Sequence, residues 1–128
     1  MDAAARALAD LTEISSQIEA AVLLDQSGAV VAATEGAGES LGTAAQALLA
    51  AADEARGAGQ RALTQLEAAT LDGSVFVVRD GGRTIAAITA PEPTVGLVFY
   101  DLKSCLRGAA EEPAKPKRTR RKKADDAA

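Results

Sequence analysis

The sequence contains no histidine, and it has a single cysteine, Cys105. Without histidine, the chain has neither a histidine general base nor the imidazole ligands of many zinc sites. One cysteine cannot form an internal disulfide. Because no histidine can activate Cys105 and it lies on an apolar helical stripe, we expect it to be a buried structural residue. The chain also lacks the G-x-x-x-x-G-K-S/T sequence of a P-loop. These absences predict a protein that is not an enzyme and that holds no cofactor or metal.

Long apolar runs are also missing. No run approaches the roughly 20 residues that cross a bilayer, and residues 1–6 lack the basic-then-apolar order of a secretory signal. We therefore expect a cytoplasmic protein without a transmembrane segment. The 128 residues, 48% hydrophobic and 25% charged, suit one compact domain.

Charge is distributed unevenly along the chain. Residues 1–110 contain 7 Lys or Arg against 14 Asp or Glu, a net charge of −7, whereas residues 111–128 have 7 against 4, a net charge of +3. The second segment also contains Pro113 and Pro116 and no large apolar residue. This composition is typical of disorder. We expect an acidic domain over residues 1–110 and a disordered basic tail over residues 111–128.

The tail is one candidate binding segment. Its cations lie within nine residues and suit nucleic acid, an anionic membrane surface or an acidic partner. The aromatic residues Phe76, Phe99 and Tyr100 all precede the tail, so it has no side chain for base stacking. A tail that only solubilises the chain and folds back on the acidic domain is an equal alternative. The candidate tail residues are Lys115, Lys117, Arg118, Arg120, Arg121, Lys122 and Lys123.

A β-hairpin is the element around which the chain is organised. Residues 20–24 and an apolar run ending at Ala33 flank the turn sequence 25–28, a pattern typical of two paired strands. Neither arm alternates cleanly between apolar and polar residues. We therefore expect helices on both faces of both arms.

Three segments have helical periodicity. Residues 2–17 place Leu8, Leu11, Ile14 and Ile18 on one stripe, with Asp2 as a cap. Residues 40–56 form an alanine-rich second helix, which Thr43 and Gln46 start as a capping box. The third helix covers residues 94–107, and its apolar face contains Val95, Val98, Phe99, Leu102, Cys105 and Leu106.

Three further strands follow the second helix. Two Asp-Gly pairs, at Asp72 and Asp80, separate β-prone runs over residues 65–71, 75–78 and 84–89, which predicts an antiparallel meander. The most apolar strands should lie in the middle of the sheet. The sequence therefore predicts an α+β fold, αββαβββα, with a five-stranded antiparallel sheet in the order 2-1-5-4-3. The second helix covers one face, and the first and third helices cover the other.

These elements resemble the roadblock/dynein light-chain family over about residues 7–108. The resemblance rests on the leading amphipathic helix, the hairpin with Asp25 to Gly28, the alanine-rich helix, Leu71-Asp-Gly and the apolar strands that follow it. It implies a roadblock/profilin-like fold. It also implies a homodimer or close heterodimer that pairs second helices and third-strand edges, and partnership with small Ras-like GTPases.

The residues agree with such a dimer. Alanine is a good helix former that needs no partner, but in the second helix it also leaves a flat seam for a second copy. The polar strand 65–71 would leave backbone groups unpaired at the sheet edge unless its symmetry mate pairs with them. We expect more than roughly 1,000 Å² of buried area. The expected interface residues are Ala44, Ala47, Leu48, Ala51, Ala55, Gln65, Glu67 and Ala69.

Charged side chains are further candidates for function. An arginine given in trans stabilises the transition state of a GTPase, and the candidates are Arg56, Arg61, Arg79 and Arg83. A solvated surface charge is the favoured interpretation of each, since regulation by positioning the GTPase's own residues needs no arginine from this chain. The carboxylates lack the spacing of a metal loop and are expected to be solvated; they are Asp25, Glu35, Glu39, Asp53, Glu54, Asp72 and Asp80.

The favoured function is a non-catalytic dimeric regulator or scaffold of a small Ras-like GTPase, modulating GTP hydrolysis or localisation. The alternative is a dimeric adaptor whose basic tail binds the target without a GTPase.

Overall fold

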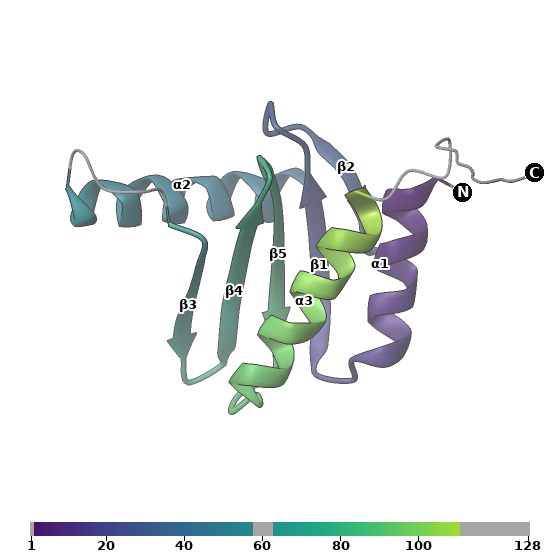
Figure 1. Cartoon of the computed structure of the whole chain (residues 1–128). Coiled ribbons are helices and arrows are strands. Elements are labelled where there is room, and N and C mark those ends of the chain that lie inside the picture. Colours follow the sequence, from purple (N-terminus) through teal and green to yellow (C-terminus); the bar gives the residue numbers. More distant parts are fainter. Residues whose placement is uncertain (1, 58–62, 111–128) are drawn as a thin grey trace, which may run out of the picture.

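One antiparallel sheet lies at the centre of the protein. The computed structural model describes residues 2–57 and 63–110. Five strands pair in the order β2-β1-β5-β4-β3, which confirms the predicted order (Figure 1). The strands are β1 (Ile18–Leu24), β2 (Val30–Ala33), β3 (Gln65–Thr70), β4 (Gly73–Asp80) and β5 (Arg83–Thr89), and the helices are α1 (Ala3–Ile14), α2 (Glu39–Arg56) and α3 (Val95–Ala110).

Alternate side chains of the sheet build two separate cores. Ala21 and Leu23 of β1 belong to the core under α1 and α3, whereas Val22 and Leu24 belong to the core under α2. Successive side chains of a strand point to opposite faces, so a strand between two helical layers must be apolar at every position. Figure 1 shows α3 with α1 on one face and α2 crossing the other, as predicted.

The two arms of the first hairpin differ in burial. All four residues from Ala21 to Leu24 in β1 are buried, as expected. In β2, Val31 and Ala33 are exposed and alternate with half-buried neighbours. The prediction that helices cover both faces of both arms is therefore wrong for β2, because this strand lies at the edge of the sheet.

Helix α1 begins where Asp2 caps it. The Asp2 Oδ1 atom accepts a hydrogen bond from the Ala5 amide at 2.8 Å, which confirms the predicted cap. The helix ends at Ile14, whose side chain is 74% exposed, and Ile18 already belongs to β1. The predicted stripe was thus one turn too long, because a spacing of four residues does not distinguish a last helical turn from the start of a strand.

The start of α2 differs from its prediction. The helix begins at Glu39 after Gly38, which has no side chain to cap it. Thr43 lies inside the helix, and the Gln46 Nε2 atom donates to the Gly28 carbonyl at 3.2 Å. The predicted capping box is therefore wrong. Gln46 instead connects α2 to the β1–β2 turn.

Small residues let α2 lie close to the sheet. A Cβ atom on Gly42 would be 3.0 Å from the Cδ2 atom of Leu24, so glycine permits an approach that a larger residue would push apart. Ala45 and Leu49 complete the buried side of the helix. At the other end Gly57 has a φ of 99° and stops the helix.

The meander forms two tight hairpins. Thr70 pairs with Gly73, and Asp80 pairs with Arg83, so each turn consists of two residues. The first turn was predicted one residue too late, since Gly73 is already the first residue of β4. The second was predicted one residue too early, since Asp80 is still the last residue of β4. Its backbone approaches the Thr89 carbonyl so closely that a side chain would clash there.

Helix α3 begins and ends later than predicted. It starts at Val95, which is exposed, and continues to Ala110. Val98, Leu102 and Leu106 form its buried side. The predicted apolar face was therefore wrong for Val95 and right for these three residues.

Candidate interaction surface

The outer side of α2 has small side chains. Four of the five predicted interface residues on this helix are exposed, and Leu48 is half-buried beside them. Spacings of three or four residues place them along one side of the helix. A second helix can approach such a surface closely because few long side chains project from it. The exposed residues are Ala44, Ala47, Ala51 and Ala55.

Strand β3 provides a sheet edge next to this helix. Within residues 2–57 and 63–110, β3 pairs with β4 alone, so its other side has backbone groups without a strand partner. Such an edge is a template for pairing with another strand. The predicted edge strand thus lies where the sequence analysis placed it.

The side chains of β3 divide between the two faces of the sheet. Glu67 lies opposite Phe76 of the α3-side core and accepts a hydrogen bond from the Ser74 hydroxyl at 3.3 Å. Strand alternation puts the other two predicted residues, Gln65 and Ala69, on this same face. The structure therefore does not bring these three side chains together with the α2 alanines. The β3 residues on the α2 face are Leu66, Ala68 and Thr70.

Leu66 and Ala68 were missed by the sequence analysis. Leu66 is partly buried and packs against the core under α2. The available signal was the alternation within β3, in which Leu66 is the only large apolar residue. The side chains of Leu66 and Ala68 lie on the face of the sheet that α2 covers, and α2 is the helix through which the dimer was predicted to form.

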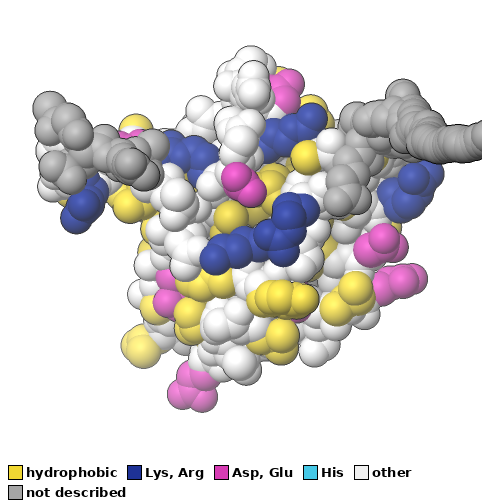
Figure 2. Space-filling model, in the orientation of Figure 1, with side chains coloured by type: hydrophobic (Ala, Val, Ile, Leu, Met, Phe, Trp, Pro, Cys, Tyr) yellow, Lys and Arg dark blue, Asp and Glu magenta, His cyan; other side chains and the backbone are white. Residues whose placement is uncertain are grey.

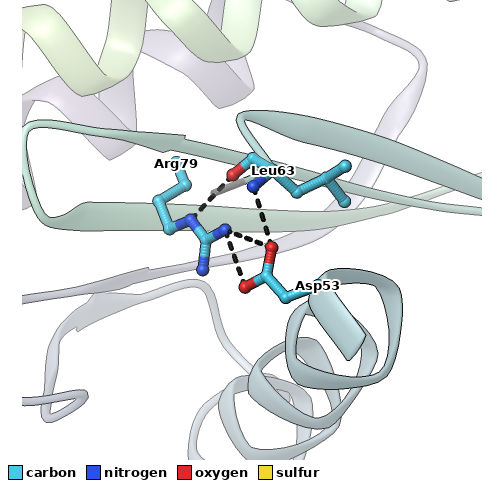
Figure 3. A network of polar contacts seen from close by, with 3 residues as sticks. All are labelled: Asp53, Leu63 and Arg79. Carbon is cyan, nitrogen blue, oxygen red and sulfur yellow. Dashed lines mark hydrogen bonds and ion pairs between the residues drawn. The ribbon is translucent and has the colours of Figure 1, made fainter. Parts of the chain in front are cut away.

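A polar network joins α2 to β4 and to the segment that enters β3 (Figure 3). The Arg79 Nη2 atom lies 3.1 and 3.0 Å from the two Asp53 carboxylate oxygens. Asp53 Oδ1 also accepts from the Leu63 amide at 2.8 Å, and Arg79 Nε donates to the Leu63 carbonyl at 2.8 Å. These contacts close a ring of three residues from three segments. We call it the Asp53–Arg79 clamp.

The clamp shifts the ionisation of its carboxylate. The hydrogen bond from the Leu63 amide, followed by the one from Arg79, holds the pKa of Asp53 below its ordinary value. Both ionised side chains are partly exposed to solvent. Asp53 is therefore not the independent solvated charge that the sequence analysis expected.

The four candidate arginines have different surroundings. Arg79 belongs to the clamp, and Arg83 donates from Nη1 to the Ala109 carbonyl at 3.0 Å. Arg56 ends α2, and Arg61 lies outside the described residues. The side chains of Arg79 and Arg83 thus help to hold the fold together.

The acidic residues form no metal site in the part of the chain that the structure describes, since no three potential ligands cluster there. Asp25 stabilises the β1–β2 turn instead: its Oδ1 accepts from the Ser27 hydroxyl and amide and from the Ala29 amide. The Ser27 hydroxyl, followed by the Ala29 amide, lowers the pKa of Asp25. Its role is structural rather than that of a solvated charge.

A groove of about 330 Å³ lies along the junction of α1 and α3. Leu11, Ile14 and Tyr100 give it an apolar lining, with Asp10 beside them and Cys105 in its wall. Cys105 is buried, as predicted. Burial, followed by the charge of Asp10, raises the pKa of its thiol to about 12. Figure 2 shows basic, acidic and hydrophobic side chains mixed over this face of the molecule.

Two expectations concern membranes and the tail. Among the residues placed by the structure, no helix has the length and apolar character to cross a bilayer. The seven cations of the tail, Lys115 to Lys123, lie outside the described residues.

Comparison with known proteins gives matches at the level of structure. No protein-family model and no curated protein sequence matches the chain. A Roadblock/LC7 domain from Streptomyces avermitilis superposes with a TM-score of 0.72 at 17% identity, covering 83% of this chain and 93% of that one. The gliding protein MglB from Thermus thermophilus gives 0.68 at 18% identity, with 84% and 85% covered. LokiProfilin2, from its complex with rabbit actin, gives 0.59 at 13% identity, with 80% and 91% covered.

These likenesses agree with the strand order, the helix positions and the placement of α2. Because the sequence identities are below 20%, these matches establish the fold alone, and any function must be argued from the surfaces of this chain. The chain has the roadblock/profilin-like fold, and its structural neighbours include Roadblock/LC7 domains and MglB.

Proposed function

We propose that the protein is a dimer formed through α2 and the edge of β3. The observation that carries this proposal is that both elements have accessible surfaces suited to a second copy. The α2 surface consists of exposed alanines, and β3 has strand pairing on one side only within the described residues. A two-fold axis beside β3 would make one continuous sheet and bring the two α2 helices together.

The dimer acts as a non-catalytic regulator or scaffold of a small Ras-like GTPase, in the cytoplasm. Support comes from the roadblock fold and from the family resemblance of the sequence, which implies such partners. Regulation works by positioning the residues of the GTPase itself, which requires no arginine from this chain. Two of the four candidate arginines, Arg79 and Arg83, already make contacts within the fold. The protein then changes either GTP hydrolysis or the location of the GTPase.

Two measurements test this function. Sedimentation equilibrium of the full chain at micromolar concentration should give the mass of a dimer. Ras-like GTPases from the same cell, loaded with GDP or with a non-hydrolysable GTP analogue, should then bind to the immobilised protein. A change in GTP hydrolysis on adding the protein identifies a regulator, and binding without such a change identifies a scaffold. A monomer that binds no GTPase in either state contradicts the proposal.

A second candidate function rests on the composition of residues 111–128. Seven cations within nine residues give this basic tail the charge to bind nucleic acid, an anionic membrane or an acidic protein. In that case the domain only dimerises, and the tail binds the target. The full chain should be compared with a variant in which the seven Lys and Arg residues are replaced by Gln. Loss of target binding in the variant favours the tail, and retained binding favours the domain.

A further inference from the structure

The last two turns of α2 lie beyond the buried part of the helix. Leu49 is the final buried residue of α2, and the residues after it up to Arg56 are exposed or half-buried. Figure 1 shows this end of the helix extending past β3. Apolar packing therefore fixes the first half of α2 on the sheet much more firmly than the second half.

Asp53 connects this second half to the sheet. Its carboxylate accepts from the Leu63 amide and from Arg79, and Arg79 in turn donates to the Leu63 carbonyl. The Arg79 amide also donates to the Thr64 carbonyl at 2.7 Å, which extends the β3–β4 pairing to the segment entering β3. One arginine thus holds the end of α2 and the beginning of β3 in a fixed relation.

The position of the clamp matters for the proposed dimer. Ala51 and Ala55, two residues on either side of Asp53, belong to the exposed α2 surface, while β3 provides the edge. A dimer that uses both elements requires them to have one relative orientation in both subunits. Without the clamp, the second half of α2 would have to be ordered on association, which costs affinity.

We propose that Asp53 and Arg79 are positioning residues that preorganise α2 and β3 as one dimer surface. This inference rests on the proposed dimer. Arginine is required because its planar fork donates to a carboxylate and a carbonyl at once, whereas lysine has a single ammonium group. The two residues act as a unit, so the loss of either should have nearly the effect of losing both.

The test uses the full chain and three variants: Asp53→Asn, Arg79→Lys and the double variant. Arg83→Lys is the matched control, since Arg83 also donates to a backbone carbonyl, but at Ala109. Sedimentation equilibrium gives the dimer dissociation constant, and hydrogen exchange reports on the Leu63 amide. We expect each single variant to raise the dimer dissociation constant about tenfold. The dissociation constant of the double variant should be no higher than that of the more weakly dimerising single variant. The control should stay within about twofold of the unmodified protein.

Urea unfolding of each variant separates positioning from a general loss of stability. If Asp53→Asn fails to fold, Arg79→Lys alone carries the test, because it keeps the charge. Unchanged dissociation constants in folded clamp variants of a dimeric protein overturn the inference and leave the proposed dimer standing. A full chain that stays monomeric at every concentration overturns both. Faster exchange at Leu63 together with a weaker dimer supports the inference.

Discussion

Phe76 of β4 meets Phe99 of α3 edge to face, with 5.0 Å between the ring centroids and 74° between the ring planes. Phe76 is completely buried, and Phe99 packs on the same core from the helix side. Edge-to-face contact places the positive rim of one ring on the negative face of the other. This pair packs α3 against β4.

The first prediction concerns this pair. Phe76→Ala should lower the free energy of unfolding by about 3–5 kcal/mol, because it removes a fully buried ring and leaves a cavity. Leu71→Ala is the control, since Leu71 is 96% exposed in the β3–β4 turn and its loss should stay within about 0.5 kcal/mol. Urea unfolding followed by circular dichroism measures both. Equal losses would show that the core assignment is wrong.

The second prediction concerns acid stability. The pKa of Asp53 is lower in the folded protein than its ordinary value of 3.8, so its ionised form stabilises the fold. This contribution is fully present above the unfolded-state pKa and is lost as pH falls through the folded-state pKa. Asp53→Asn should therefore be less stable at pH 6 and lose less stability below about pH 4. Urea midpoints between about pH 6 and about pH 2 measure the effect.

The control for removing a carboxylate is Asp72→Asn in the exposed β3–β4 turn. Its urea midpoint at about pH 6 should match that of the unmodified protein, because substitutions at exposed turn positions change stability little. If the urea midpoint of Asp53→Asn falls with acid as steeply as that of the unmodified protein, the clamp does not stabilise the folded state.

The third prediction concerns Cys105. Because its pKa rises from 9.0 to about 12, the thiolate fraction at pH 8 should be about a thousandfold smaller than that of an ordinary cysteine. Ellman's reagent should react very slowly with the folded chain and rapidly in urea. Ala9→Cys adds an exposed cysteine on α1, away from the proposed interface, as an internal standard. Fast reaction of both thiols in the folded variant would contradict the assigned burial.

The fourth prediction concerns the α2 surface. Ala51→Glu should weaken the proposed dimer at least about tenfold, because it places two like charges at a close helix contact. Ala9→Glu, on the exposed side of α1, has the same intrinsic helix cost and should leave the dissociation constant unchanged. Sedimentation equilibrium compares the two. Equal dissociation constants would place the interface elsewhere.

Much of the fold was predictable because it depends on local patterns. Two Asp-Gly pairs located the meander, and the uninterrupted apolar run before Asp25 identified a central strand. Helix boundaries were less predictable: Ile14 and Ile18 share a helical spacing, yet the helix ends at the first and a strand begins at the second. Thr43 and Gln46 have the spacing of a capping box inside an established helix.

The candidate surface was only half predictable for a different reason. The α2 alanines are visible in the composition of one helix, and they are exposed as expected. The ion pair between Asp53 and Arg79 joins residues 26 positions apart, and no local pattern pairs this aspartate with this arginine. Gln65, Glu67 and Ala69 were named as interface residues before the strand register was known. The register puts Glu67 opposite Phe76, on the face of the sheet away from α2.

The beginning of α1 and the end of α3 lie at one corner of the molecule. Asp2 and Ala109 line the same small pocket, and Figure 1 shows this corner at the opposite side of the sheet from β3. A fluorescent reporter or an affinity handle attached beside either residue would therefore project away from the β3 edge. In a complex of two copies, such labels would mark the outer flanks, and the distance between them would report on assembly in a living cell.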